Sequence, residues 1–345
     1  MSFSPIGDEL EKELAHSDGG VGNGTESPSS GGRGGRGRGG GRGRGKGGGQ
    51  RNQRGQNNGQ RRRKASPNAG GEKLSSPQNP QIKALIKLRH RRARDQQGLT
   101  VIEEPLVLRR AWESGYPLEA VYYSPDQMTA SAKELLEDLR AAVQAGQMEL
   151  KMVELSSSLL RKAAYRDQPE GILAVAPQRK RTLEDLHLRD DALLMVLENV
   201  EKPGNLGAVL RIADGVGADA VLVTGEGTDL FNPNVLRASR GAFFSVPAVQ
   251  CHVGEARDFL HERGLRVLAT TPGASESYTK ADFTGSVAVV LGCEHEGLSD
   301  AWLKDEGSEA VCIPMRGRGD SLNVSTAAAV ILYEAMRQRA IPATA

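Results

Sequence analysis

Hydrophobic and polar positions alternate regularly along most of this chain, but only from Asn79 onward. There, short and nearly continuous apolar runs are separated by longer stretches in which apolar residues recur at helical spacing. Short continuous apolar runs are typical of strands buried on both faces of a parallel sheet, and the longer stretches indicate helices. Residues 1–78 show neither pattern, so the chain is predicted to be an α/β protein that follows a segment without regular structure.

A first α/β unit is predicted over residues 79–180. Helical spacing extends over Ile82–Arg94, with a basic face that carries Lys83, Lys87, Arg89, Arg91, Arg92 and Arg94. Strands are expected at GLTVIEE, LEAVYYSP, MELKMVEL and GILAVAPQ, and helices at PLVLRRAWESG, SAKELLEDLRAAVQAG and 159–165. The polar sequence RKRTLEDLHLRDD follows, and we interpret residues 181–191 as a linker.

A second α/β unit is predicted over residues 192–345. Strands are expected at ALLMVLENV, AVLVTGEG, VPAV, RVLATTP, VAVVLGCEHEG and VCIPM. Helices are expected at NLGAVLRIADGVGA, NPNVLRASRGA and VGEARDFLHERG, and a last helix runs to about Arg339. Nearly continuous apolar strands that alternate with helices favour a mostly parallel sheet with helices on both faces.

Composition explains why the first 78 residues lack a pattern. The segment Gly31–Lys64 consists almost wholly of Gly, Arg, Gln, Asn and Lys, with twelve cations and no acid. Such a sequence has too little apolar surface to offset the entropy cost of ordering, so residues 1–78 are predicted to be a disordered Gly/Arg-rich tail. Its arginines favour contact with RNA, and a solvated linker or solubility tail is the alternative.

Charge and cysteine content limit the class of protein. The formal charge of +2 conceals an excess of +7 in residues 1–78 and of −5 in the remainder, so the folded part is not uniformly basic. Cys251, Cys293 and Cys312 are widely spaced, which argues against a disulfide framework and against a zinc site. No signal peptide and no membrane-spanning apolar run is recognisable in the sequence. A cytoplasmic protein without a metal is therefore expected.

Polar and glycine residues collect after three of the predicted strands, where parallel sheets bind ligands. ENVEKPGNLGAVLR contains Asn205 and Arg211, and VVLGCEHEGL contains Gly292 and Glu294. The third segment, CIPMRGRGDSLNVS, contains Ile313, Met315, Ser321, Leu322 and Asn323. Each residue alone has a structural explanation, such as a helix cap or a tight turn. Three such loops at one edge of a sheet favour a binding site.

These three segments resemble the three motifs of the SpoU (TrmH-like) branch of the SPOUT RNA methyltransferases. The first has N-LGA-x-x-R at Asn205–Arg211, and the second has LG-x-E-x-x-GL at Leu291–Leu298. The third has IPM-x-G-x-x-x-SLNVS, followed by a helix that ends in RQR, over Ile313–Arg339. FNPNVLRASRGAFFSVP is similar to the family segment between the first two motifs. Residues 79–178 resemble the family's ribosomal-protein-like substrate-binding domain.

The resemblance implies a C-terminal trefoil knot, a homodimer and S-adenosylmethionine as the cofactor. It assigns cofactor binding to seven residues of the strand-end loops: Thr270, Thr271, Leu291, Gly292, Ile313, Met315 and Leu322. It assigns catalysis to five polar residues: Asn205, Arg211, Glu294, Ser321 and Asn323. RNA contact is expected at five cations: Lys87, Arg91, Arg92, Arg237 and Arg240.

The expected reaction is methyl transfer to a ribose 2′-hydroxyl of structured RNA, most readily ribosomal RNA of the large subunit. A guanidinium keeps its proton at neutral pH, so Arg211 is expected to position a phosphate or stabilise a developing alkoxide. Glu294 is expected to orient Arg211 or Asn205, and it is the only carboxylate among the matched positions that can accept a proton. His295 is expected to face away if the strand continues through it. Methylation of transfer RNA, or a non-catalytic RNA-binding role in ribosome assembly, are the alternatives.

Overall fold

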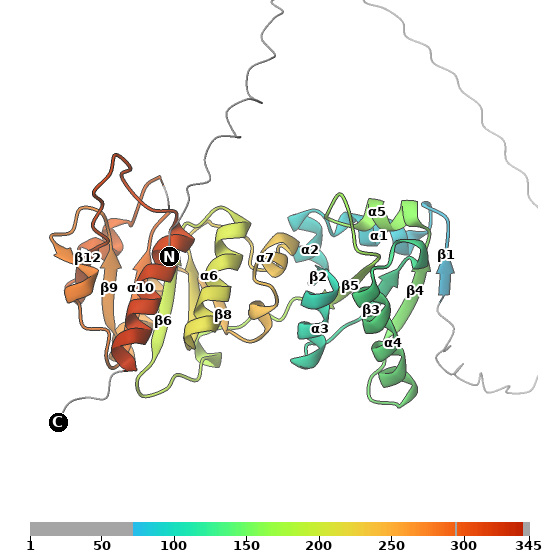
Figure 1. Cartoon of the computed structure of the whole chain (residues 1–345), viewed down its shortest axis with the longest axis horizontal. Helices are drawn as coiled ribbons and strands as arrows, with labels where there is room; N and C mark the ends of the chain where they lie inside the picture. Colours follow the sequence, from blue (N-terminus) through green and yellow to red (C-terminus); the bar gives the residue numbers. More distant parts are fainter. Residues whose placement is uncertain (1–71, 294, 341–345) are drawn as a thin grey trace, which may run out of the picture. The chain divides into compact units, whose positions relative to one another are not determined.

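The computed structural model describes residues 72–293 and 295–340. These described residues fall in one compact unit, in which the strands form two sheets that are flanked by helices (Figure 1). The predicted Gly/Arg-rich tail lies outside the described residues up to position 71. Beyond that position the prediction of disorder was wrong in part, because Glu72–Leu74 form a short strand, β1, that pairs with β4.

The first sheet has five strands in the order β1-β4-β3-β5-β2. The strands are β2 (Leu99–Glu103), β3 (Ala120–Tyr123), β4 (Lys151–Leu155) and β5 (Ile172–Pro177), besides β1. Residues of β3 alternate between two buried clusters, with Val121 on the side of α3 (Pro105–Glu113) and α4 (Ala130–Gln144). Tyr122 faces α1 (Pro80–Lys87) and α5 (Ser157–Ala163). This sheet is mixed, because β5 runs antiparallel to both of its neighbours.

The basic helix predicted over Ile82–Arg94 is broken in two. The first part, α1, ends at Lys87, and α2 (Arg91–Gln97) follows a short turn. Arg94 is buried, and its guanidinium donates to the main-chain oxygens of Leu88 and Arg89 at 3.0 and 3.2 Å and to Asp229 at 2.5 Å. Arg94 therefore belongs to the core, whereas Lys87, Arg91 and Arg92 stay exposed.

The second sheet is entirely parallel among the described strands, in the order β10-β12-β9-β11-β6-β7-β8. Its strands are β6 (Leu193–Glu198), β7 (Ala220–Thr224), β8 (Ala248–Cys251), β9 (Arg266–Thr270), β10 (Glu276–Ser277), β11 (Val287–Leu291) and β12 (Ser308–Cys312). The predicted parallel sheet is thus confirmed for this unit. The short edge strand β10 and the one-turn helix α9 (Asp300–Leu303) were not predicted.

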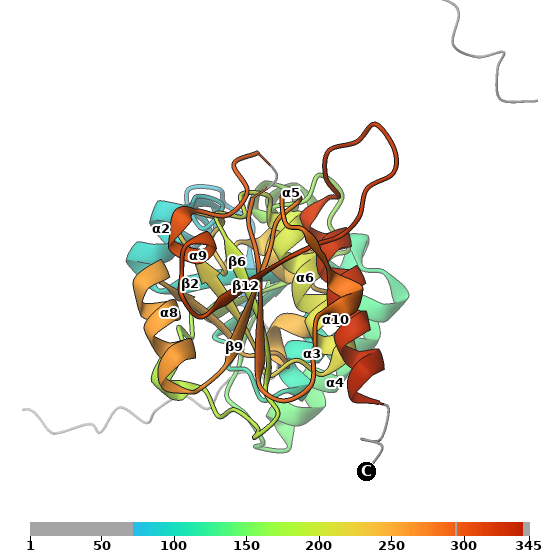
Figure 2. The ribbon, with the colours of Figure 1, turned by 90° about the vertical axis from the view of Figure 1, so that its left-hand side faces the viewer.

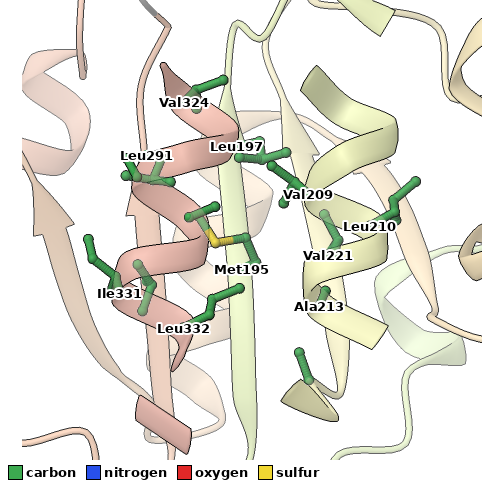
Figure 3. Packing of buried hydrophobic residues seen from close by; sticks show 14 of the residues in the cluster. Met195, Leu197, Val209, Leu210, Ala213, Val221, Leu291, Val324, Ile331 and Leu332 are labelled. Carbon is green, nitrogen blue, oxygen red and sulfur yellow. The ribbon is translucent and has the colours of Figure 1, made fainter. Parts of the chain in front are cut away.

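Helices cover both faces of the second sheet (Figure 2). On one face α6 (Pro203–Val216) packs beside α10 (Val324–Arg339), and α7 (Pro233–Ala238) packs against α6. Figure 3 shows Met195 and Leu197 of β6 meeting Val209 of α6 and Leu332 of α10. On the other face lie α8 (Val253–Glu262) and α9, with Trp302 fully buried. This packing fixes the ends of the strands on which the candidate site is built.

Candidate active site

The loops that follow β6, β11 and β12 contain the polar and glycine residues of the three motifs. They meet at the carboxyl edge of the parallel sheet. In the strand register, Leu291 of β11 pairs with Leu197 of β6 on one side and with Thr270 of β9 on the other. Val311 of β12 pairs with Thr270 in turn. Four strands therefore end side by side, and the loops that follow them surround one cavity. The sequence predicted a binding site at this edge of the sheet because polar and glycine residues follow these strands.

A cavity of about 410 Å³ lies among these loops. All seven residues that the resemblance assigned to the cofactor line it: Thr270, Thr271, Leu291, Gly292, Ile313, Met315 and Leu322. The side chain of Leu322 also packs against the buried cluster beneath the sheet. The structure brings these residues together, and their binding role stays a prediction.

One wall of the cavity exists because two glycines face each other. A Cβ atom added to Gly292 would lie 2.1 Å from the main-chain carbon and oxygen of Gly297. The loop doubles back at this point through a bridge between Cys293 and Gly297, and Gly297 has a φ of +70°. Glycine is thus required at Gly292 because the loop backbone approaches it too closely for a side chain.

The lining combines apolar surface with unused hydrogen-bonding capacity. The hydroxyl of Thr270 is buried and has no hydrogen-bond partner among the residues that the structure describes. Ile313, Met315 and Leu322 provide apolar surface next to it. A buried hydroxyl without a partner is costly unless a ligand satisfies it. The cavity therefore fits a ligand that has both an apolar part and a polar group.

Two of the predicted catalytic residues are in contact at the mouth of the site. Asn323 caps the N-terminus of α10, and its Oδ1 accepts from the backbone N–H of Ser325 at 3.1 Å. The side-chain amide of Asn323 donates to Oδ1 of Asn205, on the first turn of α6, at 3.3 Å. The predicted cap is confirmed, and the same side chain links the first and third motifs.

Other polar groups surround this pair. Ser321 is exposed and lines the large cavity. Lys202, Asn205 and His295 line a small recess that adjoins Cys293, and His295 also lines the large cavity. The expectation that His295 faces away assumed that the strand continues to it, and β11 (Val287–Leu291) ends before that position. Glu294 lies outside the described residues.

Arg211 does not line this cavity. It is exposed on α6, six residues after Asn205, so the two side chains are separated by roughly 120° about the helix axis. Gly215 lies on the same side one turn later, where an added Cβ would be 3.1 Å from the hydroxyl of Tyr333 on α10. Arg211 therefore points toward the outer surface formed by α6 and α10.

The cations expected to contact RNA lie away from the cavity. Arg237 and Arg240 are at the end of α7, where Arg240 has a φ of +54° and its carbonyl accepts from the guanidinium of Arg110 at 2.6 Å. A guanidinium nitrogen of Arg240 is 4.0 Å from the carboxylate of Glu104. Lys87, Arg91 and Arg92 are exposed on α1 and α2.

The motif comparison missed one buried carboxylate at the site. Glu198 is the last residue of β6 and is 2% exposed. Its carboxylate accepts from the backbone N–H of Ser299 at 2.8 Å and from the Ser299 hydroxyl at 2.7 Å. Ser299 ends the loop that contains Gly292 and Gly297, so Glu198 anchors that wall of the cavity. The sequence contained one signal for this residue, because Glu198 is an acidic side chain at the end of a continuous apolar strand.

Replacing Glu198 with glutamine is expected to weaken cofactor binding about tenfold without unfolding the protein. Glutamine turns an N–H group toward Ser299, so one hydrogen bond to a charged group is lost and the loop loosens. Calorimetric titration of S-adenosylmethionine measures the change, and Ser299→Ala, which keeps the backbone bond, is expected to show a smaller loss. Equal affinity in Glu198→Gln and the unaltered protein would contradict the anchoring role.

A parallel α/β domain whose strand-end loops surround a cavity belongs to the class of α/β proteins that bind a ligand at the carboxyl ends of their strands. Residues 192–333 match the SpoU rRNA Methylase family, and residues 79–174 match the MRM3-like substrate binding domain. The chain belongs to the SpoU rRNA methylase family, which confirms the resemblance seen in the sequence.

Relatives agree with this assignment over most of the folded chain. The chain is 31% identical over 267 residues to the 23S rRNA (uridine(2479)-2'-O)-methyltransferase of Streptomyces viridochromogenes, covering 75% of this chain and 89% of the relative. A solved RNA 2'-O ribose methyltransferase is 40% identical and has a TM-score of 0.67, covering 78% of this chain and 100% of that one. An AdoMet-bound rRNA methyltransferase from Sinorhizobium meliloti is 27% identical, with a TM-score of 0.69 over 77% of this chain and 97% of its own.

Two further observations concern metals and membranes. Within residues 72–293 and 295–340, no group of three His, Cys, Asp or Glu side chains is arranged to hold a metal ion. In the same part of the chain, no helix combines the length and the apolar character needed to cross a membrane.

Proposed function

We propose that this protein transfers the methyl group of S-adenosylmethionine to a ribose 2′-hydroxyl of ribosomal RNA. The observation that carries the proposal is the single cavity lined by all seven expected cofactor residues, beside the bonded pair Asn205 and Asn323. Family membership and the relatives named as 23S rRNA 2'-O-methyltransferases support the same reaction.

The residues of the cavity fit S-adenosylmethionine. The buried hydroxyl of Thr270 offers a hydrogen bond, and Gly292 lets the ligand approach the loop backbone. Ile313 and Leu322 supply apolar surface for an adenine ring. When bound, this cofactor supplies a methyl group on a positively charged sulfur, which is a good leaving group and needs no metal.

The chain's own polar residues then act on the ribose. Asn205 and Asn323 are held by each other and by the cap of α10, so they can orient a hydroxyl without loss of side-chain entropy. Glu294 is proposed as the proton acceptor and Ser321 as a further hydrogen-bonding group. Arg211 is proposed to bind a phosphate or the developing alkoxide.

The proposed fold includes a trefoil knot in the C-terminal unit. Strand β12 lies beyond β9, yet α10 packs on β11 and α6, so the chain after Cys312 must pass the end of β9. Residues from this crossing, Met315, Ser321 and Leu322, line the same cavity as the loop after Gly292. This crossing, which brings the segment after β12 against the loop that follows β11, supports the proposed knot.

A homodimer is also proposed, with its interface on the outer surface of α6 and α10. Tyr333 and Met336 are 52% and 44% exposed on this surface, which is unusual for large apolar side chains grouped on one helix. A second copy placed there would cover both residues and would bring Arg211 to the boundary between subunits. Sedimentation of the purified protein checks the oligomeric state.

The domain boundaries are proposed as in the sequence, with a substrate-binding domain at 79–180, a linker at 181–191 and the methyltransferase domain at 192–345; strand β1 (Glu72–Leu74) extends the sheet of the first domain beyond its predicted start. The match of residues 79–174 and 192–333 to two separate families supports this division. The disordered state of the Gly/Arg-rich tail and the cytoplasmic location stay predictions.

The reaction is tested by incubating the protein with tritium-labelled S-adenosylmethionine and with ribosomal RNA, transfer RNA or neither. Label is expected in large-subunit ribosomal RNA at an alkali-resistant ribose position. Label in transfer RNA alone would favour the transfer RNA alternative. Cofactor binding without transfer to any RNA would favour a non-catalytic assembly factor.

A further inference from the structure

A second cavity, of about 440 Å³, lies away from the candidate active site. It is bounded by α2, by the turn after α3, by the start of the linker, and by the segment from Asp229 through β8, which includes the one-turn helix η3 (Ala242–Phe244). None of the three family motifs contributes a residue to the lining of this cavity. Its lining combines aromatic rings with cations: Arg91, Tyr116, Arg179, Lys180, Arg181, Phe243 and Phe244.

One wall of the cavity is aromatic and held in place. The rings of Tyr116 and Phe244 pack edge to face with centroids 5.0 Å apart, and Phe243 packs against Phe244 at 5.3 Å. All three rings are half-buried and reach the cavity. The hydroxyl of Tyr116 donates to the carbonyl of Pro177 at 2.7 Å and accepts from the N–H of Arg179 at 3.2 Å. A flat ligand can therefore bind without reorganising this wall.

The rim of the cavity is cationic. Arg179, Lys180 and Arg181 are consecutive and exposed, and the Arg179 guanidinium lies 5.8 Å from the centre of the Tyr116 ring. Two carboxylates also reach the cavity, and each is paired. Asp229 is bonded to buried Arg94, and Asp95 is 3.6 Å from Arg91. Arg179, Lys180 and Arg181 therefore leave the rim with a positive charge.

We propose that this cavity binds one unpaired nucleotide of the RNA substrate, with its base against the aromatic wall and its phosphates at Arg179, Lys180 and Arg181. The inference rests on the proposed function, because it takes RNA as the substrate. Proteins that bind single-stranded nucleic acid combine a cationic groove with aromatic rings on which bases stack. The volume falls within the range of pockets for ligands of this size.

The first test measures the affinity of the full chain for a fluorescein-labelled ten-nucleotide polyuridine RNA. Alanine at Arg179, Lys180 and Arg181 together is expected to weaken binding about tenfold. A matched control replaces three exposed cations elsewhere, Lys133, Arg161 and Lys162, and changes the net charge equally; it is expected to weaken binding less than threefold. Equal losses in the two variants would overturn the proposal, because they would reflect net charge alone.

The second test needs no substitution and so does not depend on folding of a variant. The same RNA with 5-iodouridine is cross-linked to the unaltered protein by ultraviolet light, and the attached peptides are identified by mass spectrometry. Attachment at Tyr116, Phe243 or Phe244 is expected. Attachment confined to other peptides would overturn the proposal.

Two control measurements are made. The first distinguishes RNA from a free nucleotide as the ligand, and the second distinguishes a failure of this proposal from a failure of the proposed function. Uridine 5′-monophosphate is expected to reduce the cross-link only at concentrations far above that of the RNA. If the mononucleotide protects these rings while the RNA does not attach to them, the site binds a free nucleotide and the RNA assignment is wrong. Methyl transfer to ribosomal RNA is assayed in parallel, so that failure of the proposed reaction is recognised independently of the cross-link.

Discussion

Replacing Arg211 with alanine is expected to lower the rate of methyl transfer at least about a hundredfold, with little change in the affinity for S-adenosylmethionine. Arg211 is exposed and does not line the cofactor cavity, so its removal leaves that cavity intact. Loss of a positioned charge that stabilises a developing oxyanion typically costs this much in rate. Single-turnover transfer of labelled methyl groups, alongside calorimetric titration of the cofactor, measures both quantities.

Lysine at position 211 serves as the control, because it keeps the charge and loses the planar pair of donors. An intermediate rate is expected for Arg211→Lys. Sedimentation of both variants tests whether the surface of α6 and α10 still associates, since Arg211 lies on the side that faces Tyr333. A rate for Arg211→Ala equal to that of the unaltered enzyme would remove Arg211 from the reaction.

Replacing Gly292 with alanine is expected to weaken cofactor binding at least about a hundredfold. The added methyl group would lie 2.1 Å from main-chain atoms of Gly297 and 2.5 Å from the nitrogen of Leu298. Main-chain atoms cannot rotate away, so the loop must shift and the cavity wall moves with it. Titration with S-adenosylmethionine measures the loss, and circular dichroism establishes that the fold remains.

Gly317→Ala is the matched control for this substitution. Gly317 belongs to the loop between β12 and α10, and no atom lies within 4 Å of the position that its Cβ would take. Nearly normal affinity is expected for this variant. If Gly292→Ala binds the cofactor as tightly as Gly317→Ala, the loop between Gly292 and Leu298 does not form the cofactor site.

Local sequence was enough to place most elements of the second unit. The continuous apolar runs became the parallel strands β6, β7, β9 and β11, because a strand covered on both faces needs apolar side chains at every position. Gly217 ends α6 in the left-handed conformation, and Asn323 caps α10. The clustering of Thr270, Leu291 and Gly292 followed from chain direction, since parallel strands end at the same edge, whereas Met315 and Leu322 reach the cavity through the segment that crosses back after β12.

The break between α1 and α2 could not be read from the sequence. Helical spacing continues through Leu88, Arg89 and His90, which include neither glycine nor proline. The carbonyls freed at the end of α1 are satisfied by Arg94, and Arg94 is in turn paired with Asp229, which is 135 residues away. A cation that the sequence pattern assigns to an exposed face is thus buried by a partner that only the folded chain provides.

Sequence by itself determined the family, the order of helices and strands, and the loops that carry the chemistry, because each depends on residues close together in the chain. Tertiary structure decided that Glu198 anchors Ser299, that His295 lines the cavity, and that Arg211 is exposed away from it. It also brought Tyr116, Arg179 and Phe244 together around a second cavity. These arrangements arise from contacts between segments far apart in sequence, whose geometry is fixed only when the sheets and helices pack.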